Sequence, residues 1–178
     1  ALAKRMGYKK VSEMKLAVAK HIKEYCAGGG FLFAMCSGTD SFDIALAADG
    51  VDICAQMFDG DPVDPNAQVK LDFNKTLAFQ NFKLDKNPLN YEFSDIDATQ
   101  TRTLTQANDY FTLFDFSAKW DLVPTMLTQN HDKVIKGFMG QTTAFKKDLV
   151  KTGVTVLGEN KGAGEVRYLH GEIGKGQF

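Results

Sequence analysis

The sequence lacks long apolar runs, clusters of basic residues and an excess of either charge. No run approaches the ~18 apolar residues of a membrane-spanning helix, so we predict no membrane span. The 21 Lys and Arg residues nearly balance the 22 Asp and Glu residues, and the formal net charge is -1. A near-neutral chain without basic patches offers no electrostatic attraction to nucleic acid or to an anionic membrane surface. We therefore expect neither among its partners.

Residues that bind metals or form disulfides are also scarce. The three cysteines include no Cys-x-x-Cys pair and the three histidines are not paired, which argues against a zinc site and a disulfide framework. The odd number of cysteines leaves a free thiol, which suits the cytoplasm as well as a periplasmic or secreted location. The acidic loop 59–66 carries oxygen ligands for calcium, but it lacks the glycine at the sixth position of an EF-hand loop. We interpret it as a solvated acidic turn and predict no metal ion and no cofactor.

The 178 residues and their 44% hydrophobic content suit one domain, 1–178, with its own core. Apolar residues at helical spacing predict a helix over 11–27, with Ser12 as its N-cap, and a second helix over 39–48. The unbroken apolar run 31–35 between them is typical of a strand that is buried on both faces. Helix–strand–helix order is the repeating unit of a parallel α/β sheet, so we predict an α/β fold.

Cys36 lies where this strand is expected to meet the second helix. Ala34 and Gly38 flank it at two residues on either side, the pattern of a nucleophile elbow, in which a tight turn needs small neighbours. Backbone N–H groups at a helix start lower the pKa of a thiol and stabilise an oxyanion, and the N–H of Ser37 would be one such donor. Cys36 and Ser37 are therefore the candidate catalytic residues. The alternative is that Cys36 is a small buried apolar residue.

The stretch from Gly28 to Ser41 resembles the elbow region of the class I glutamine amidotransferase-like superfamily. It is most similar to the trehalose-utilisation (ThuA-like) branch, in which a Gly-Gly-Gly strand leads into a His-Ser-Ala-Thr-Asp-Thr type segment. Cysteine stands here where that branch usually has histidine. A second match, Gly174 to Phe178, resembles the Gly-Lys-Gly-Arg-Val/Phe entry into the last core strand. The whole chain also resembles bacterial proteins that carry the name "asparagine synthetase B", although it shows no synthetase nucleotide loop.

The resemblance implies a flavodoxin-like parallel sheet flanked by helices, with residues 59–130 as a loop-rich and β insertion. It also implies a histidine base after the last core strand, beyond Phe178. His170 fits that position poorly, and His131 beside Asp132 is a loop pair. Since the first expected element is a helix and the last residues begin a strand, we expect the chain to be a fragment of a longer protein, with strand 31–35 central in its sheet.

The remaining patterns predict further elements without assigning them a function. Strands are expected over 77–84, 109–116, 123–127, 154–157 and 166–170, a helix over 142–151 and a tight hairpin turn over 171–176. The segment 90–109 is polar and is expected to be an exposed excursion.

Two hypotheses from different classes follow. The first is a cysteine hydrolase or amidotransferase-like domain that attacks an amide or related acyl carbon through Cys36. The second is a non-catalytic ThuA-like module that binds carbohydrate or a protein partner through the aromatic segment 59–130. A base within hydrogen-bond reach of Cys36 favours the first, and an apolar, sealed Cys36 favours the second.

Overall fold

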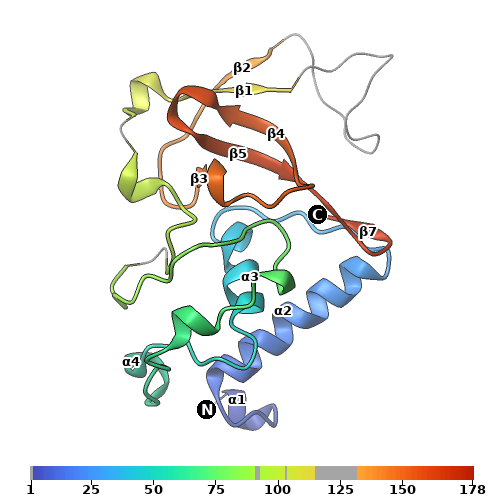
Figure 1. Ribbon diagram of the computed structural model, residues 1–178, viewed down its shortest axis with the longest axis vertical. Helices are drawn as coiled ribbons and strands as arrows, with labels where there is room; N and C mark the ends of the chain where they lie inside the picture. Colours follow the sequence, from blue (N-terminus) through green and yellow to red (C-terminus); the bar gives the residue numbers. More distant parts are fainter. Residues whose placement is uncertain (1, 91–92, 103, 115–131) are drawn as a thin grey trace.

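The computed structural model describes residues 2–90, 93–102, 104–114 and 132–178, with helices early in the chain and strands late in it (Figure 1). The α-helices are α1 (Leu2–Arg5), α2 (Val11–Ala27), α3 (Gly38–Ala47) and α4 (Gln56–Asp59). The strands are β1 (Tyr110–Leu113), β2 (Val134–Lys136), β3 (Phe145–Lys146), β4 (Thr155–Asn160), β5 (Glu165–His170), β6 (Glu172–Ile173) and β7 (Gly176–Gln177). Short 3-10 helices fill the connections: η1 (Ala67–Lys70), η2 (Phe73–Lys75), η3 (Thr99–Thr101), η4 (Gln106–Asn108), η5 (Lys147–Leu149) and η6 (Lys161–Ala163).

The main sheet is antiparallel, so the predicted flavodoxin-like parallel sheet is wrong. Its five strands have the order β2-β1-β4-β5-β3, and each neighbouring pair is antiparallel. The strands β6 and β7 form a separate antiparallel hairpin. The reason lies in the connections: β4 and β5 are joined by a single short turn, and such a turn permits only antiparallel pairing. A parallel sheet needs long crossovers, usually helices, whereas α1 to α4 all precede the first described strand.

The segment 31–35 is extended but is not a buried central strand. Phe31 forms a single parallel bridge with Gln177, and the Leu32 N–H donates to the Gln177 carbonyl over 3.0 Å. Phe31, Phe33 and Met35 are 58%, 61% and 69% exposed. An apolar run indicates that a segment can be buried, but it does not supply the second layer that would cover it.

The two expected helices are confirmed. The helix α2 has the predicted bounds, and α3 begins at Gly38, one residue before the predicted start. Ser12 is not the N-cap of α2, because Lys10 occupies that position. The Glu13 carboxylate accepts hydrogen bonds from the backbone N–H groups of Lys9 and Lys10 over 3.0 and 3.2 Å. A glutamate reaching back from the first turn therefore caps this helix.

Some of the elements predicted later in the chain are confirmed and others are wrong. The strands expected over 109–116, 154–157 and 166–170 are confirmed in the described residues as β1, β4 and β5, and the hairpin over 171–176 as β6–β7. The helix expected over 142–151 is wrong, since β3 and η5 lie there and Phe145 pairs with Val166 of β5. The strand expected over 77–84 is wrong too, because that segment makes only isolated bridges. The predicted strand 123–127 and His131 lie outside the described residues.

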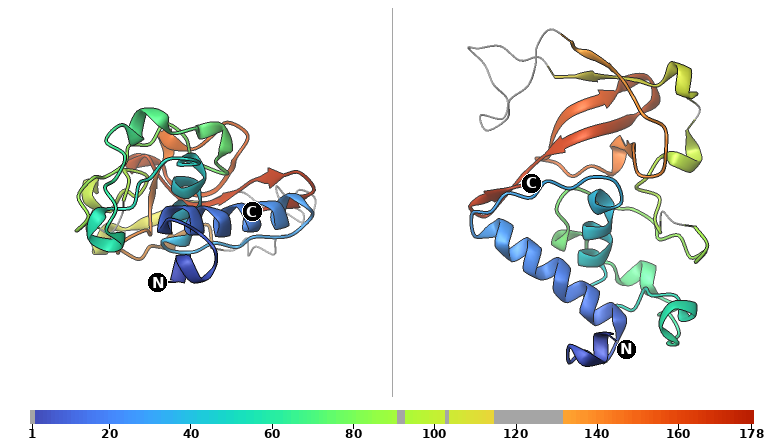
Figure 2. Two further views of the ribbon diagram at one scale, coloured as in Figure 1. Left: turned by 90° about the horizontal axis from the view of Figure 1, so that it is seen from below. Right: turned by 180° about the vertical axis from the view of Figure 1, so that it is seen from behind.

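The core joins α3 to the sheet. In Figures 1 and 2, α3 lies in the middle of the molecule, with α2 on one side and the main sheet on the other. The buried residues of this core come from α3, from the loops after it and from the sheet: Ile44, Ala47, Ala78, Phe79, Phe82, Ile96, Phe145, Leu149 and Val166. Residues within 59–130 thus help to build the centre of the domain, and the segment 94–98 of the expected exposed excursion contains buried residues.

Asp43 of α3 fixes the loop that follows η2. Its carboxylate, 1% exposed, accepts hydrogen bonds from the backbone N–H groups of Leu77, Ala78 and Phe79 over 2.5, 2.8 and 2.6 Å. The carboxylate therefore satisfies three successive N–H groups of a segment that, within the described ranges, otherwise forms only a single bridge, between Phe79 and Val150.

No helix in the described ranges combines the length and the apolar character that a membrane span requires.

Candidate functional site

Cys36 occupies the turn that leads into α3, as predicted. Its backbone φ is 55°, in the left-handed region that few residues other than glycine adopt, and its side chain is exposed. The turn is closed by hydrogen bonds from the Gly38 N–H to the Met35 carbonyl and from the Thr39 N–H to the Cys36 carbonyl. Ser37 is the N-cap of α3 and its hydroxyl makes no capping hydrogen bond. The thiol therefore stands at the positive end of a ten-residue helix.

Thr142, from the loop before β3, is the hydrogen-bond partner of the thiol. Its Oγ1 lies 3.1 Å from the Cys36 Sγ and donates to the Gln141 carbonyl over 2.7 Å, so the thiol is the donor to Thr142. Thr142 is 3% exposed and has a φ of 55°. Left-handed backbone is costly for a β-branched residue and persists only where its surroundings enforce it. Two strained residues therefore meet side chain to side chain at this turn.

Asp97 holds Thr142 in this conformation. The Thr142 N–H donates to Asp97 Oδ2 over 2.7 Å, and the Thr99 hydroxyl lies 2.7 and 2.8 Å from the two carboxylate oxygens. The Thr99 hydroxyl also lies 3.0 Å from the Gly140 carbonyl. Asp97, itself 4% exposed, thus ties the loop around Thr142 to the start of η3.

Asp40, in the first turn of α3, is the unusual member of this group. It is 2% exposed, and its Oδ2 has no hydrogen-bond partner among the described residues. Burial, with a smaller contribution from the neighbouring carboxylates Asp97 and Asp43, raises the pKa of Asp40 to about 7. A buried carboxyl group with a pKa of about 7 therefore lies in the first turn of α3, four residues after Cys36.

No histidine is hydrogen-bonded to Cys36 among the described residues. His21 lies on α2, with its Nδ1 2.7 Å from the Ala17 carbonyl. His170 is 8% exposed at the end of β5, where its Nε2 lies 3.5 Å from Gln177 Oε1. The neighbours of the thiol are instead a hydroxyl group and, behind it, carboxyl groups.

A narrow apolar cavity lies beside the turn. Its volume is about 100 Å³, and it shares Ala34 and Thr39 with the segment that carries Cys36. The remaining lining is mainly aromatic and aliphatic, and it includes Phe31, Phe33, Phe42, Phe145 and Phe178. This is smaller than the roughly 300–1,000 Å³ of sites that enclose a drug-sized ligand, so it suits one small apolar group.

The other two cysteines are less accessible as nucleophiles. Cys26 is fully buried at the end of α2, where its Sγ donates to the Gln177 carbonyl over 3.0 Å, and burial raises its pKa. Burial and the nearby Asp59 carboxylate raise the pKa of Cys54 to about 11. Cys36 is the exposed one of the three thiols.

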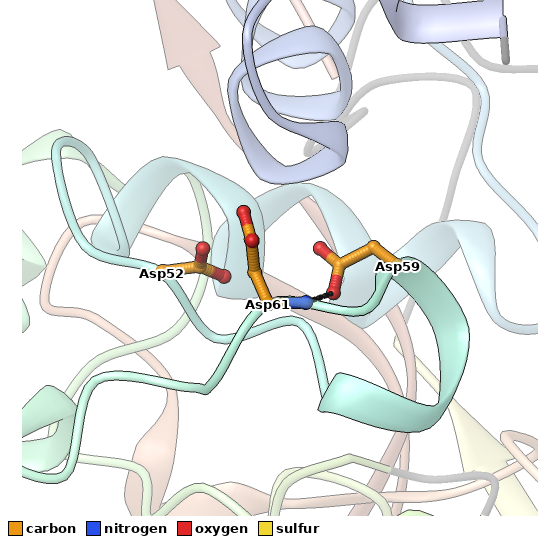
Figure 3. A group of neighbouring side chains, drawn as sticks. All are labelled: Asp52, Asp59 and Asp61. Atoms are coloured by element: carbon orange, nitrogen blue, oxygen red, sulfur yellow. Dashed lines mark hydrogen bonds between the residues drawn. The ribbon is translucent and has the colours of Figure 1, made fainter.

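Asp59 and Asp61 of the acidic loop form a compact cluster with Asp52, and one oxygen of each lies within 4.8 Å of the others (Figure 3). All three side chains are partly exposed. The Lys10 Nζ lies 3.0 Å from Asp52 Oδ2 and 3.4 Å from Asp61 Oδ2. The dashed line in Figure 3 is the hydrogen bond from the Asp61 N–H to Asp59 Oδ1. A lysine from the start of α2 thus supplies the positive charge that this cluster attracts.

A second charged cluster is internal to the sheet region. Arg102 and Arg167 pair with Asp109 and Glu165, and all four side chains are at most 5% exposed. The Arg102 Nη2 lies 2.6 Å from Asp109 Oδ1, and its Nε lies 3.1 Å from Glu165 Oε1. Two cations and two anions balance each other, so this cluster links β5 to the residue before β1 and leaves no net charge for a ligand.

The sequence predicted Cys36 and Ser37 as candidate site residues at a helix start, but it gave no indication of Thr142 or Asp97. Thr142 lies 106 positions from Cys36, and no local spacing connects the two. Comparison with protein-family models, curated protein sequences and solved structures gives no match to this chain.

Proposed function

We propose that this chain is a cysteine-dependent hydrolase that acts on an amide or related acyl carbon through Cys36. The observation that carries the proposal is the placement of the thiol: exposed, in a left-handed turn at the start of α3, and hydrogen-bonded to a strained threonine. Strained backbone at an exposed nucleophile is typical of active sites. The resemblance of residues 28–41 to the amidotransferase-like elbow supports the same chemistry, although the main sheet of the described residues is antiparallel and not flavodoxin-like.

In the proposed reaction the Cys36 sulfur attacks the acyl carbon, a C–S bond forms, and the C–N or C–O bond to the leaving group breaks. The proton lost by the thiol ends on that leaving group. Water then attacks the thioester, which releases the acid and returns the proton to the sulfur. The Ser37 N–H at the helix start is the proposed oxyanion donor, and the apolar cavity beside Ala34 accommodates a small side group of the substrate.

The test is hydrolysis of a panel of aryl esters, aryl amides and primary carboxamides by the purified chain and two variants. We expect Cys36→Ala to abolish turnover and the matched control Cys54→Ala to leave it unchanged. Mass spectrometry after acid quenching should show the acyl group on Cys36. Turnover that survives Cys36→Ala, or no turnover and no acylation of the wild type across the panel, would overturn the proposal.

A second candidate function is a binding module without catalysis. The exposed row of Phe31, Phe33 and Met35 beside the apolar cavity favours it. The binding surface predicted within 59–130 does not include Phe79 and Phe82, because both are fully buried. In this case oligosaccharide or peptide binding, measured by calorimetry, would be lost in Phe33→Ala and retained in Cys36→Ala. The opposite pattern would exclude this candidate.

A further inference from the structure

Three buried carboxyl groups lie at or near the start of α3, and the structure gives them different partners. Asp43 accepts three backbone N–H groups, and Asp97 accepts hydrogen bonds from Thr99 and Thr142. Asp40 Oδ2 has no hydrogen-bond partner among the described residues, although the residue is only 2% exposed. Of the three, Asp40 is therefore the group whose negative charge is least compensated.

Asp40 is connected to the thiol by its electrostatic interaction with Asp97 and by the contacts of Asp97 with Thr142 and of Thr142 with Cys36. The charged groups that act on Asp40 are Asp97, from the segment before η3, and Asp43, one turn further along α3. Lys151, which follows η5, acts on Asp43. Asp97 binds the Thr142 N–H, and the Thr142 Oγ1 contacts the Cys36 Sγ. A negative charge on Asp40 therefore acts on Asp97, whose carboxylate accepts the hydrogen bond from the Thr142 N–H.

We propose that Asp40 is a positioning residue that couples the reactivity of Cys36 to its own protonation state. While Asp40 holds its proton, it adds no negative charge beside Asp97, and Thr142 keeps its place against the thiol. When Asp40 ionises, a second buried negative charge opposes formation of the Cys36 thiolate and repels Asp97 from Asp40. The proton lost by Asp40 goes to solvent, and no other bond changes. This inference rests on the proposed function, in which Cys36 is the nucleophile, but what it predicts is the reactivity of the Cys36 thiol.

The burial of Asp40 and its two carboxylate neighbours raise its pKa to about 7, so the coupling operates across neutral pH. Below that range Asp40 is neutral and resembles an asparagine in charge. Above it, the wild type carries a charge that an asparagine lacks. The comparison of these two side chains at several pH values is therefore a direct measure of the coupling.

The experiment is the rate of Cys36 alkylation by iodoacetamide between pH 5.5 and pH 9 in the wild type, Asp40→Asn and Asp148→Asn. Asp148 is an exposed carboxylate on η5 and serves as the matched control. We expect Asp40→Asn and the wild type to react at the same rate at pH 5.5. The variant should react about three- to tenfold faster at pH 8.5, since one pKa unit corresponds to tenfold in thiolate. A merely structural role for Asp40 would change the rate by the same factor at every pH.

A constant ratio across the pH range, or a profile identical to that of Asp148→Asn, would overturn the inference. If Asp40→Asn does not fold, 13C NMR titration of the aspartate carboxyl groups in the wild type replaces it. An Asp40 signal that titrates below pH 5 would then overturn the inference, and a titration near pH 7 that moves the Thr142 amide signal would support it. Alkylation requires no substrate, so a pH-dependent ratio without hydrolysis would refute the proposed function alone. Hydrolysis with a constant ratio would refute the inference alone.

Discussion

Two regions of this molecule place a cysteine beside aspartates, and they differ in how the negative charge is compensated. In the loop 52–61, Cys54 lies near three partly exposed carboxylates, two of which share the Lys10 ammonium. At the start of α3, Cys36 lies near the buried carboxyl groups of Asp40 and Asp97, and no salt bridge to either is found in the described part of the chain. Hydrogen bonds from Thr99 and Thr142 provide the compensation for Asp97, whereas Asp40 Oδ2 has no hydrogen-bond partner among the described residues.

The difference shows why a dense acidic sequence is a poor guide to a chemical site. Partly exposed carboxylates gain little free energy from an ion pair with a lysine. Asp40, by contrast, is buried without a cation from the ranges that the structure describes, and its burial raises its pKa to about 7. The loop 52–61 has more acidic residues but is the weaker candidate for a chemical site. The buried Asp40 and Asp97 are the stronger candidates.

The largest effect that separates the two regions is expected in the pH dependence of stability. The pKa of Asp40 rises on folding from 3.8 to about 7, so the folded state keeps a proton that the unfolded state releases. This proton contributes about 4 kcal/mol to the free energy of unfolding. The contribution is fully present below about pH 4 and is lost as pH rises through 7. Asp40→Asn should remove this dependence and raise the unfolding free energy at pH 8 relative to the wild type. Urea denaturation at pH 5 and pH 8 measures both effects, and equal pH slopes for the two proteins would contradict the prediction.

The second effect concerns the thiols themselves. At pH 7.5 we expect Cys36 to be alkylated at least about tenfold faster than Cys54 or Cys26. Cys54 is almost fully protonated at that pH because its pKa is raised to about 11, and Cys26 is fully buried. Peptide mapping by mass spectrometry after brief treatment with iodoacetamide gives the order of labelling. Earlier labelling of Cys54 would show that the loop 52–61 is the reactive region.

A smaller effect is expected when the cation of the loop is removed. Lys10→Met should hardly change the midpoint of thermal unfolding, because the lysine and the carboxylates are partly exposed and water replaces the ion pair. The variant should also leave the alkylation rate of Cys36 unchanged. Differential scanning calorimetry at low and high salt tests this, and a large drop in the midpoint would show that the cluster is as poorly solvated as the Asp40 region.

The smallest effect is expected at Gly38. The nucleophile-elbow pattern predicts a crowded turn in which Gly38→Val is damaging and Ser41→Ala is not. A Cβ at Gly38 would meet only the Ala34 Cβ, at 3.9 Å, which is ordinary van der Waals contact. We therefore expect Gly38→Ala to change the unfolding free energy by less than about 1 kcal/mol. Equilibrium denaturation beside Ser41→Ala measures it, and a substantially larger loss would restore the crowded elbow.

The sequence was informative where local spacing decides the structure. The apolar periodicity of 11–27 and the residues around Gly38 specify α2 and α3, and the position of Cys36 follows from them. The direction of the sheet did not follow, because a run such as Phe31–Met35 is compatible with any sheet until its neighbours are known. Thr142 and Asp97 were missed for the same reason. Their contacts with the Cys36 region depend on a tertiary arrangement that no short motif encodes.

The C-terminal hairpin gives one further consequence, which concerns the order of folding. The Lys175 N–H donates to the Ala27 carbonyl over 2.8 Å, and Gln177 exchanges backbone hydrogen bonds with Gly30 and Leu32. A Cβ at Gly176 would lie only 1.9 Å from the Cys26 carbonyl oxygen, so β7 and the end of α2 fit together only through glycine. The segment that leads into Cys36 is thus anchored by residues about 150 positions later in the chain. We therefore expect the turn that carries the thiol to reach its final structure only after this hairpin has been synthesised. Contacts of such long range in sequence form slowly.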